Sequence, residues 1–80
     1  MDTGSLERFI VDDLLHGDRK TIGPDEPLVS SGVIDSLGML KLIGFLETEM
    51  GLTIGDGEVA PENFETLRKI LQFVERKKTD

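Results

Sequence analysis

Hydrophobic residues near the N-terminus recur with the spacing of a helix. Four of them occupy positions i, i+3, i+4 and i+8 and form one apolar stripe: Leu6, Phe9, Ile10 and Leu14. This spacing predicts an amphipathic helix. Ser5 or Thr3 can cap its start and Gly17 can end it, because hydroxyl side chains are favoured N-caps and glycine is favoured just past a helix end.

Residues 17–35 lack such a period and are dense in residues that interrupt helices. These are Gly17, Gly23, Pro24, Pro27 and Gly32. The segment is therefore predicted to be a long loop. It also holds four apolar residues that should pack on a core: Ile22, Leu28, Val33 and Ile34. Loops of this length are uncommon in compact domains and are often functional.

The most regular pattern covers residues 36–50, which we predict to be the second helix. On a wheel of about 100° per residue, five apolar residues share one narrow arc and form the expected core face: Met39, Leu42, Ile43, Leu46 and Met50. The opposite side carries Leu37, Lys41, Gly44 and Thr48, and Leu40 lies on the flank. Leu37 and Leu40 are therefore expected to be exposed apolar residues.

The remaining residues predict short elements followed by a last helix. Gly51 should end the second helix, residues 52–54 are expected to be extended, and residues 55–57 should form a turn. Pro61 should start a short helix, and Thr66 should cap a final one whose end is basic. The pattern predicts an all-α fold: a small bundle of three longer helices plus one short helix, with a long loop between helices one and two.

The acidic charge of the chain bears on its partners. Its 80 residues include 16 acidic and 9 basic side chains, a net charge of −7, which argues against binding to nucleic acid or to an anionic membrane. Eight of the acids lie in residues 1–35, whereas residues 36–50 carry a net charge of only −1. We therefore expect most of the negative charge to be distant from a partner at the second helix. No apolar run is long enough for membrane insertion and no signal peptide is recognisable, so we expect a cytoplasmic protein.

Residue types that catalyse reactions or bind metals are scarce. The chain has no cysteine and one histidine, His16, which excludes a thiol nucleophile, a zinc-thiolate site and a multi-histidine metal site. The acidic turn at residues 56–58 lacks the other ligand positions of an EF-hand. We therefore expect no catalytic residues, no metal site and no enzyme activity.

The segment Gly32–Leu37 joins the long loop to the second helix and allows two interpretations. The first is structural, because Asp and Ser are favoured N-caps. The second is chemical, because a phosphodiester on the Ser36 hydroxyl would lie beside the unpaired N–H groups and the positive dipole end of the helix. The tripeptide Asp35-Ser36-Leu37 by itself does not decide between them.

In its surroundings, this tripeptide resembles the motif of the acyl and peptidyl carrier protein family. The resemblance rests on residues 28–47 and covers nearly the whole chain, since the break at residues 51–54 and the segment 63–67 also fall where carriers have them. In that family the serine of the motif carries 4′-phosphopantetheine. The resemblance implies that a phosphopantetheinyl transferase loads Ser36 from coenzyme A, with Asp35 as its motif neighbour. The thiol of the arm would then hold an acyl or aminoacyl group as a thioester.

The resemblance also implies how such a protein works. Residues 1–80 would form a single carrier domain that acts as a monomer. Its partners would be an acyl- or aminoacyl-loading ligase and a downstream acyl-transfer enzyme. A carrier of this kind catalyses nothing itself, which fits the lack of catalytic residues in the chain.

The second helix departs from fatty-acid-synthesis carriers, whose equivalent helix is strongly acidic. Here it contains Lys41 and two interior glycines, Gly38 and Gly44, each costing about 1 kcal/mol relative to alanine. Either the two glycines have no function and the helix tolerates them, or a partner or cargo approaches so closely there that a larger side chain would clash. The departure favours a carrier dedicated to one pathway, for example an aminoacyl, polyketide-like or cell-envelope acyl modification. We expect such a carrier to dock on its partners through Leu37, Leu40, Lys41 and Gly44. A general fatty-acid carrier and a non-covalent helical interaction module are the alternatives.

Overall fold

The computed structural model describes residues 2–17 and 21–79, and the regular elements of this part are all helical. In chain order they are α1 (Thr3–Phe9), the π-helical segment η1 (Ile10–Leu14), α2 (Ser36–Met50), the 3₁₀ turn η2 (Asp56–Glu58), α3 (Pro61–Phe64) and α4 (Leu67–Thr79). This arrangement confirms the predicted all-α fold of three longer helices and one short one. Within the predicted loop, residues 18–20 lie outside the described residues.

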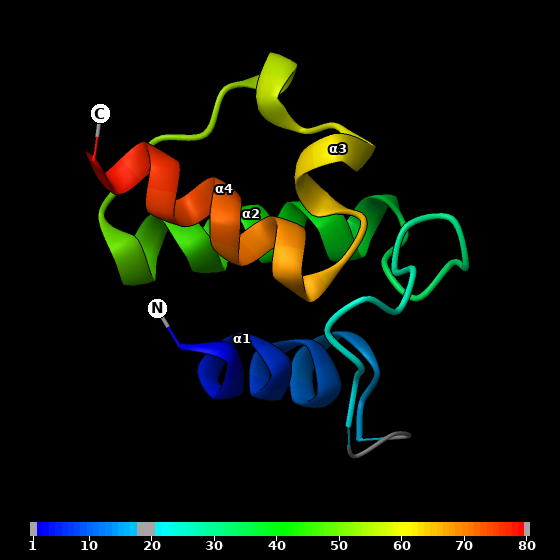
Figure 1. The fold of residues 1–80 in the computed structure, drawn as a ribbon. Helices are drawn as coiled ribbons and strands as arrows, with labels where there is room; N and C mark the ends of the chain where they lie inside the picture. The colour runs from blue at the N-terminus through cyan, green and yellow to red at the C-terminus, as the bar shows by residue number, and fades with distance from the viewer. Residues whose placement is uncertain (1, 18–20, 80) are drawn as a thin grey trace.

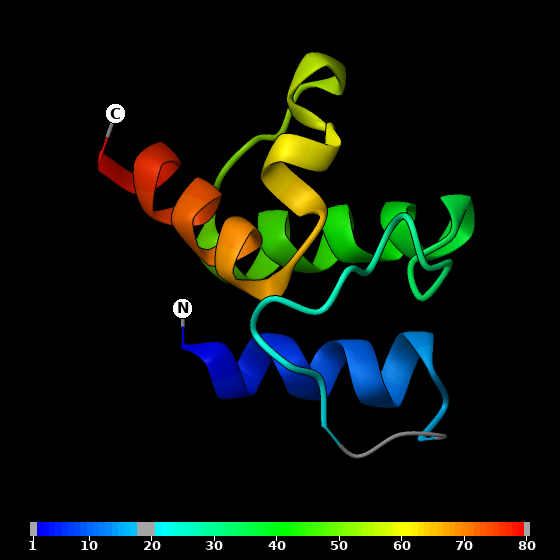
Figure 2. The same cartoon turned by 45° about the vertical axis from the view of Figure 1, so that its right-hand side comes forward.

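Helix α4 is the element around which the others pack. It contacts α1, α2 and α3, and Figures 1 and 2 show α1 lying beneath α2 and α4 while α3 stands beside the start of α4. The loop before α2 runs along the side of the bundle where α4 begins. Among residues 2–17 and 21–79 there is no helix with the length and apolar character of a membrane-spanning segment.

The first helix differs from the prediction at its start and in the geometry of its last turn. Its start is capped by Asp2, whose carboxylate accepts a hydrogen bond from the Ser5 N–H at 2.7 Å, rather than by Ser5 or Thr3. Its last turns are π-helical, and the wider turn rotates the apolar stripe so that Val11 is buried and Leu14 is only half-buried. A straight α-helical wheel cannot anticipate this shift.

Helix α2 matches its predicted bounds. Asp35 caps it, and Gly51 ends it with a left-handed φ of 65°, a conformation that glycine adopts without strain. Of the predicted core face, Leu42 and Leu46 are fully buried, while Met39, Ile43 and Met50 are half-buried. Leu37 and Leu40 are 61% and 69% exposed, which confirms the prediction for both.

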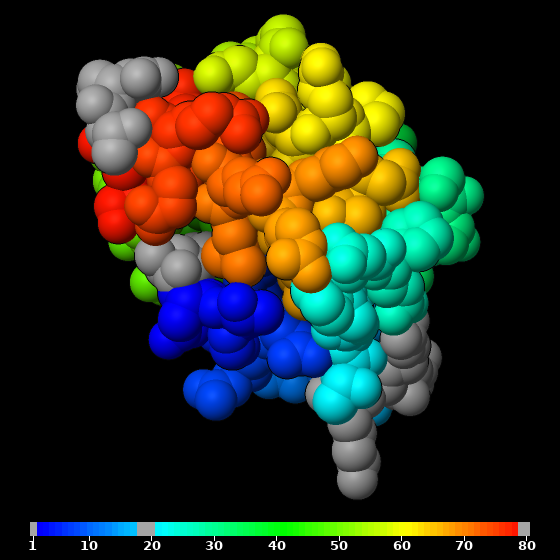
Figure 3. Space-filling model, in the orientation of Figure 1, coloured from blue at the N-terminus to red at the C-terminus, as the bar shows by residue number. Residues whose placement is uncertain are grey.

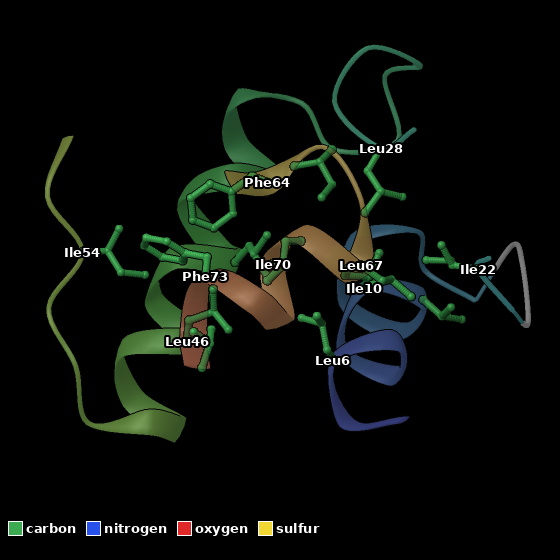
Figure 4. Packing of buried hydrophobic residues seen from close by; sticks show 14 residues of the cluster. Leu6, Ile10, Ile22, Leu28, Leu46, Ile54, Phe64, Leu67, Ile70 and Phe73 are labelled. Atoms are coloured by element: carbon green, nitrogen blue, oxygen red, sulfur yellow. The ribbon is translucent and has the colours of Figure 1, made fainter. Parts of the chain in front are cut away.

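The core is filled by residues of all the helices, with most from α4 and from the first helix (α1 and η1), and the loop closes one side. Figure 4 shows Phe64 of α3 and Phe73 of α4 side by side between Ile54 and Ile70, and their ring centroids lie 5.2 Å apart in a tilted arrangement. The loop contributes three buried residues, as predicted for its apolar positions: Ile22, Leu28 and Ile34. Thr66 caps α4 as expected, since its hydroxyl accepts a hydrogen bond from the Lys69 N–H at 3.1 Å.

Candidate functional site

Ser36 is the first residue of α2 and is exposed. The helix cap is made by its neighbour, because Oδ1 of Asp35 accepts a hydrogen bond from the Gly38 N–H at 2.7 Å. The helix therefore does not need the Ser36 hydroxyl for capping. A group attached to that hydroxyl lies at the positive end of a helix of 15 residues.

A groove of about 510 Å³ opens beside Ser36, between the start of α2 and the start of α3. Most of its lining is apolar, and only Asp35 and Ser36 are polar. The apolar lining residues are Val29, Ile34, Met39, Val59, Ala60 and Pro61. Pockets that hold small organic ligands are typically about 300–1,000 Å³ and mostly apolar. The groove thus has the size and chemistry to hold part of a flexible organic group tethered at Ser36.

The loop that leads to Ser36 is fixed by Glu65, the residue that follows α3. Oε1 of Glu65 accepts hydrogen bonds from the N–H groups of Val29 and Ser30, at 3.1 and 3.0 Å, and from the Ser30 hydroxyl at 3.0 Å. The Glu65 carbonyl accepts another from the Leu28 N–H at 2.7 Å. The pKa of the Glu65 carboxyl is lowered, and the hydrogen bond from the Ser30 N–H contributes most to this shift. Nothing in the sequence near Glu65 indicates this role, because its partners lie 35 and 36 residues away.

A second connection joins the same loop to α4. Arg68 donates from Nε and Nη2 to the two carboxylate oxygens of Asp25, at 2.8 and 3.0 Å, and this pairing lowers the pKa of Asp25. The Arg68 N–H also donates to the Pro24 carbonyl at 3.0 Å. Figure 3 shows the loop, in cyan, lying directly against the start of α4. The ion pair is exposed, so it orients the loop more than it stabilises the fold.

Stability should fall in acid because the carboxylates of Glu65, Glu58 and Asp25 all have lowered pKa values in the folded state. Their stabilisation is present above the unfolded pKa, near 4, and is lost as the pH drops through the lower folded pKa. We expect the Tm, measured by circular dichroism, to decline below about pH 4. Glu65→Gln should lower the Tm at pH 7 and reduce this decline.

Glu62→Gln is the matched control, since Glu62 is an exposed glutamate on α3 itself. It should follow the wild-type curve. Identical pH profiles for the Glu65→Gln and Glu62→Gln variants would contradict the role given to Glu65.

The two interior glycines of α2 have different surroundings. Gly38 is buried, and a Cβ there would lie 3.2 Å from Oδ1 of Asp35 and 3.7 Å from side-chain atoms of Ile34 and Leu14. The close approach at Gly38 is therefore made by its own chain. At Gly44, which is exposed, a Cβ would meet nothing within 4 Å. Of the two, only Gly44 is placed to admit the close approach of another molecule.

The segment η1 places the acidic residues Asp12 and Asp13 next to α2, contrary to the expectation from the sequence. A second open groove, of about 600 Å³, is lined by Phe9, Asp12, Asp13, His16, Lys41, Gly44, Phe45, Thr48 and Glu49. Phe9 stacks on Phe45 along it, with ring centroids 4.1 Å apart. The expectation that the acids before residue 36 are distant from the second helix is thus wrong for Asp12 and Asp13. Both share this groove with Lys41 and reduce its local positive charge.

Comparisons with known proteins agree with this geometry. The family model described as "Phosphopantetheine attachment site" matches residues 8–74. A probable acyl carrier protein, PigG of Serratia sp. (strain ATCC 39006), is 30% identical over 73 residues, which are 91% of this chain and 84% of that relative. A D-alanyl carrier protein of Streptococcus mutans serotype c is 33% identical over 74 residues, 92% of each chain. A chain in the structure described as "Crystal structure of FAD-dependent dehydrogenase" is 30% identical with a TM-score of 0.80, covering 86% of this chain and 97% of that one.

The chain therefore belongs to the phosphopantetheine attachment family. It is a carrier protein rather than an enzyme, and its prosthetic group is a covalent 4′-phosphopantetheine. The residues present fit such a group, since an exposed hydroxyl stands at a helix N-terminus beside a largely apolar groove. The arm supplies the thiol that the cysteine-free chain lacks.

Proposed function

We propose that Ser36 carries the 4′-phosphopantetheine arm and that the protein presents an acyl or aminoacyl group, held on the arm as a thioester, to dedicated biosynthetic enzymes. The supporting observation is that the Ser36 hydroxyl is exposed at the start of α2 while Asp35 provides the cap. In the loading step the Ser36 oxygen attacks the phosphorus of coenzyme A that bears the pantetheine. A new O–P bond forms, the pyrophosphate bond breaks, and adenosine 3′,5′-bisphosphate leaves. The transferase accepts the hydroxyl proton.

The names of the relatives guide the finer proposal. Relatives named as D-alanyl carrier proteins support an aminoacyl cargo, and the probable acyl carrier protein supports an acyl one. Either cargo requires a ligase that activates it and an enzyme that receives it from the arm. The chain matched in the structure described as an FAD-dependent dehydrogenase adds a flavin dehydrogenase as a candidate for the enzyme that acts on the loaded group.

The proposed docking face lies on α2 next to Ser36. It consists of Leu37, Leu40, Lys41 and Gly44, all exposed. Exposed apolar side chains beside an attachment site are suited to be hot spots of a partner interface, and Gly44 leaves room for a partner's backbone or a large side chain. Such a face relies on apolar contact more than on attraction to a basic patch.

The direct test is the intact mass of the apo protein after incubation with coenzyme A and a promiscuous phosphopantetheinyl transferase. We expect a mass increase of one 4′-phosphopantetheine, with the modified residue identified as Ser36 by peptide fragmentation. A modification at a different residue would reject the proposed site. No mass increase would reject the proposed loading.

Lys41→Glu tests whether the protein serves general fatty-acid synthesis. A transferase that docks through a basic patch gains association rate from an opposing negative field. We expect slow malonyl transfer from a fatty-acid-synthesis transferase to the wild-type holo protein, and faster transfer to the Lys41→Glu variant. The gain should be largest at low salt, because the Debye length at physiological salt is only about 8 Å.

Lys69→Glu is the control for the net charge, since Lys69 is exposed on α4 and the substitution changes the charge by the same amount. It should leave the rate near that of the wild type. Fast transfer to the wild type, with no gain for Lys41→Glu, would assign the protein to general fatty-acid synthesis.

A further inference from the structure

Two open grooves overlap between the first helix and α2. One has a volume of about 400 Å³ and the other of about 600 Å³. Five residues line both of them, and we call these five the shared trough: Phe9, Asp12, Asp13, Phe45 and Glu49. They come from α1, η1 and α2, so the trough exists only because the first helix lies against α2.

The apolar part of the trough is a pair of stacked aromatic rings. The ring centroids of Phe9 and Phe45 lie 4.1 Å apart, and the ring planes differ by 12°. Each ring covers one face of the other, yet both side chains are only half-buried and both line the two grooves. The stack therefore offers accessible aromatic surface to a further flat group.

The polar part of the trough consists of three carboxylates. Asp12, Asp13 and Glu49 are exposed, and within the part of the chain that the structure describes, none of their carboxylates has an ion-pair or hydrogen-bond partner. The basic side chains nearby each line one of the two grooves but not the other: Arg8, His16 and Lys41. The shared trough thus carries three negative charges and no positive one.

This combination of aromatic rings and carboxylates selects among ligand classes. In the described ranges, no three His, Cys, Asp or Glu side chains are placed to hold a metal ion. A purely apolar segment would remove the carboxylates from water without pairing them. A lysine ammonium pairs with carboxylates but has no plane to stack. An arginine guanidinium stacks on an aromatic face while its N–H groups donate to carboxylates, so it satisfies both parts of the trough.

The trough adjoins the proposed docking face on α2. Lys41 and Gly44 belong to that face and also line the larger groove. Phe45 follows Ser36 by nine residues, which is about 14 Å along a helix that rises 1.5 Å per residue. A protein partner typically covers about 800 Å² of surface, an area roughly 30 Å across. One partner bound over Ser36 therefore reaches the trough as well.

We propose that the shared trough binds an arginine side chain of a partner enzyme that docks on α2. The guanidinium stacks on the Phe9–Phe45 pair and donates hydrogen bonds to the carboxylates beside it. This inference rests on the proposed docking face. It adds a contact on the first helix and states the chemistry of the partner's side chain. Because the second contact lies to one side of α2, it fixes how the partner is rotated about that helix.

The test titrates the full-length chain with three small probes and follows its NMR resonances. N-acetyl-arginine amide and N-acetyl-lysine amide have the same charge, and N-acetyl-citrulline amide has a planar end without charge. We expect the arginine probe to shift the ring resonances of Phe9 and Phe45 and the signals of the three acids. It should bind about two- to fivefold more tightly than the lysine probe, as a cation stacked on an exposed ring does. The citrulline probe should cause no comparable shift.

Two variants separate the roles of the rings and the carboxylates. Phe45→Leu removes one ring and keeps an apolar side chain, so it should abolish the preference for arginine over lysine. The double variant Asp12→Asn, Asp13→Asn keeps the stack and should weaken binding of both cationic probes severalfold. Its matched control is Asp56→Asn with Glu62→Gln, which removes two exposed acids on η2 and α3. The control should bind the arginine probe like the wild type.

The outcomes distinguish this proposal from the ones on which it builds. Equal affinity for the arginine and lysine probes, or shifts spread over the surface outside the trough, would overturn the assignment to arginine. Unchanged binding by the Asp12→Asn, Asp13→Asn variant would overturn the trough as the site. The titration needs no attached arm, so failure to load Ser36, measured by mass, rejects the attachment site alone. A Leu37→Ala holo protein that passes on its cargo at the wild-type rate rejects the part of the docking face formed by Leu37.

Discussion

Replacing Ser36 with alanine should abolish attachment of 4′-phosphopantetheine and leave the fold intact. Attachment requires an oxygen nucleophile at the start of α2, and alanine has none. The fold should survive because Asp35 rather than Ser36 caps α2, through its 2.7 Å hydrogen bond from the Gly38 N–H. We expect the free energy of unfolding to change by less than about 0.5 kcal/mol, as for most surface substitutions, whereas loss of a cap costs about 1 kcal/mol.

Mass spectrometry after incubation with coenzyme A and a transferase measures the loading, and urea denaturation measures the stability. Ser30→Ala and Ser31→Ala are matched controls, because both serines are exposed in the loop that precedes α2. Their hydroxyls donate hydrogen bonds within the protein, to Glu65 and to the Pro27 carbonyl. Both variants should load like the wild type. An arm found on the Ser36→Ala protein would contradict the assignment.

Replacing Leu46 with alanine should strongly lower the stability of the fold. This residue is fully buried on the core face of α2, so Leu46→Ala removes apolar contacts and leaves a cavity among residues of α2 and α4. Substitutions of this kind cost about 2–5 kcal/mol. For a domain of this size the loss is a large part of the total free energy of unfolding, and it should appear as a marked fall in the urea midpoint.

Leu37→Ala is the matched control, since it makes the same chemical change on the same helix at a position that is 61% exposed. It should change the free energy of unfolding by less than about 1 kcal/mol. If Leu37 contributes to docking, the variant should load normally and yet receive or pass on its cargo more slowly. Equal destabilisation by the two substitutions would show that the core face of α2 has been assigned wrongly.

Features that depend on residues close in sequence were predictable. The bounds of α2 follow from Asp35 as cap, a helical apolar period and Gly51 as stop, and all of these signals lie within about one turn of the positions they determine. The exposure of Leu37 and Leu40 follows from the same period, as 61% and 69% exposed fractions confirm. The start of helix one was predicted less well, because Asp2, Thr3 and Ser5 are all favoured caps.

Features that depend on contacts between distant residues required the tertiary structure. Glu65 holds Val29 and Ser30 across 36 and 35 positions, and Lys77 holds Glu58 across 19. A charged surface residue in the sequence carries no sign of which backbone N–H or side chain it will meet. The acids of helix one were assigned to a distant surface for the same reason, although folding places Asp12 and Asp13 in one groove with Lys41.

Caps, glycine stops and apolar periods are local properties of the chain, so they were enough to place the helices, the loop and the serine at the start of α2. The surroundings of that serine depend on how distant segments pack together. A largely apolar groove forms there from three separate segments, and hydrogen bonds from Val29 to Glu65 and from Lys77 to Glu58 hold the neighbouring backbone in place. A cavity is the space left between packed elements, so its size depends on how those elements meet rather than on any one of them.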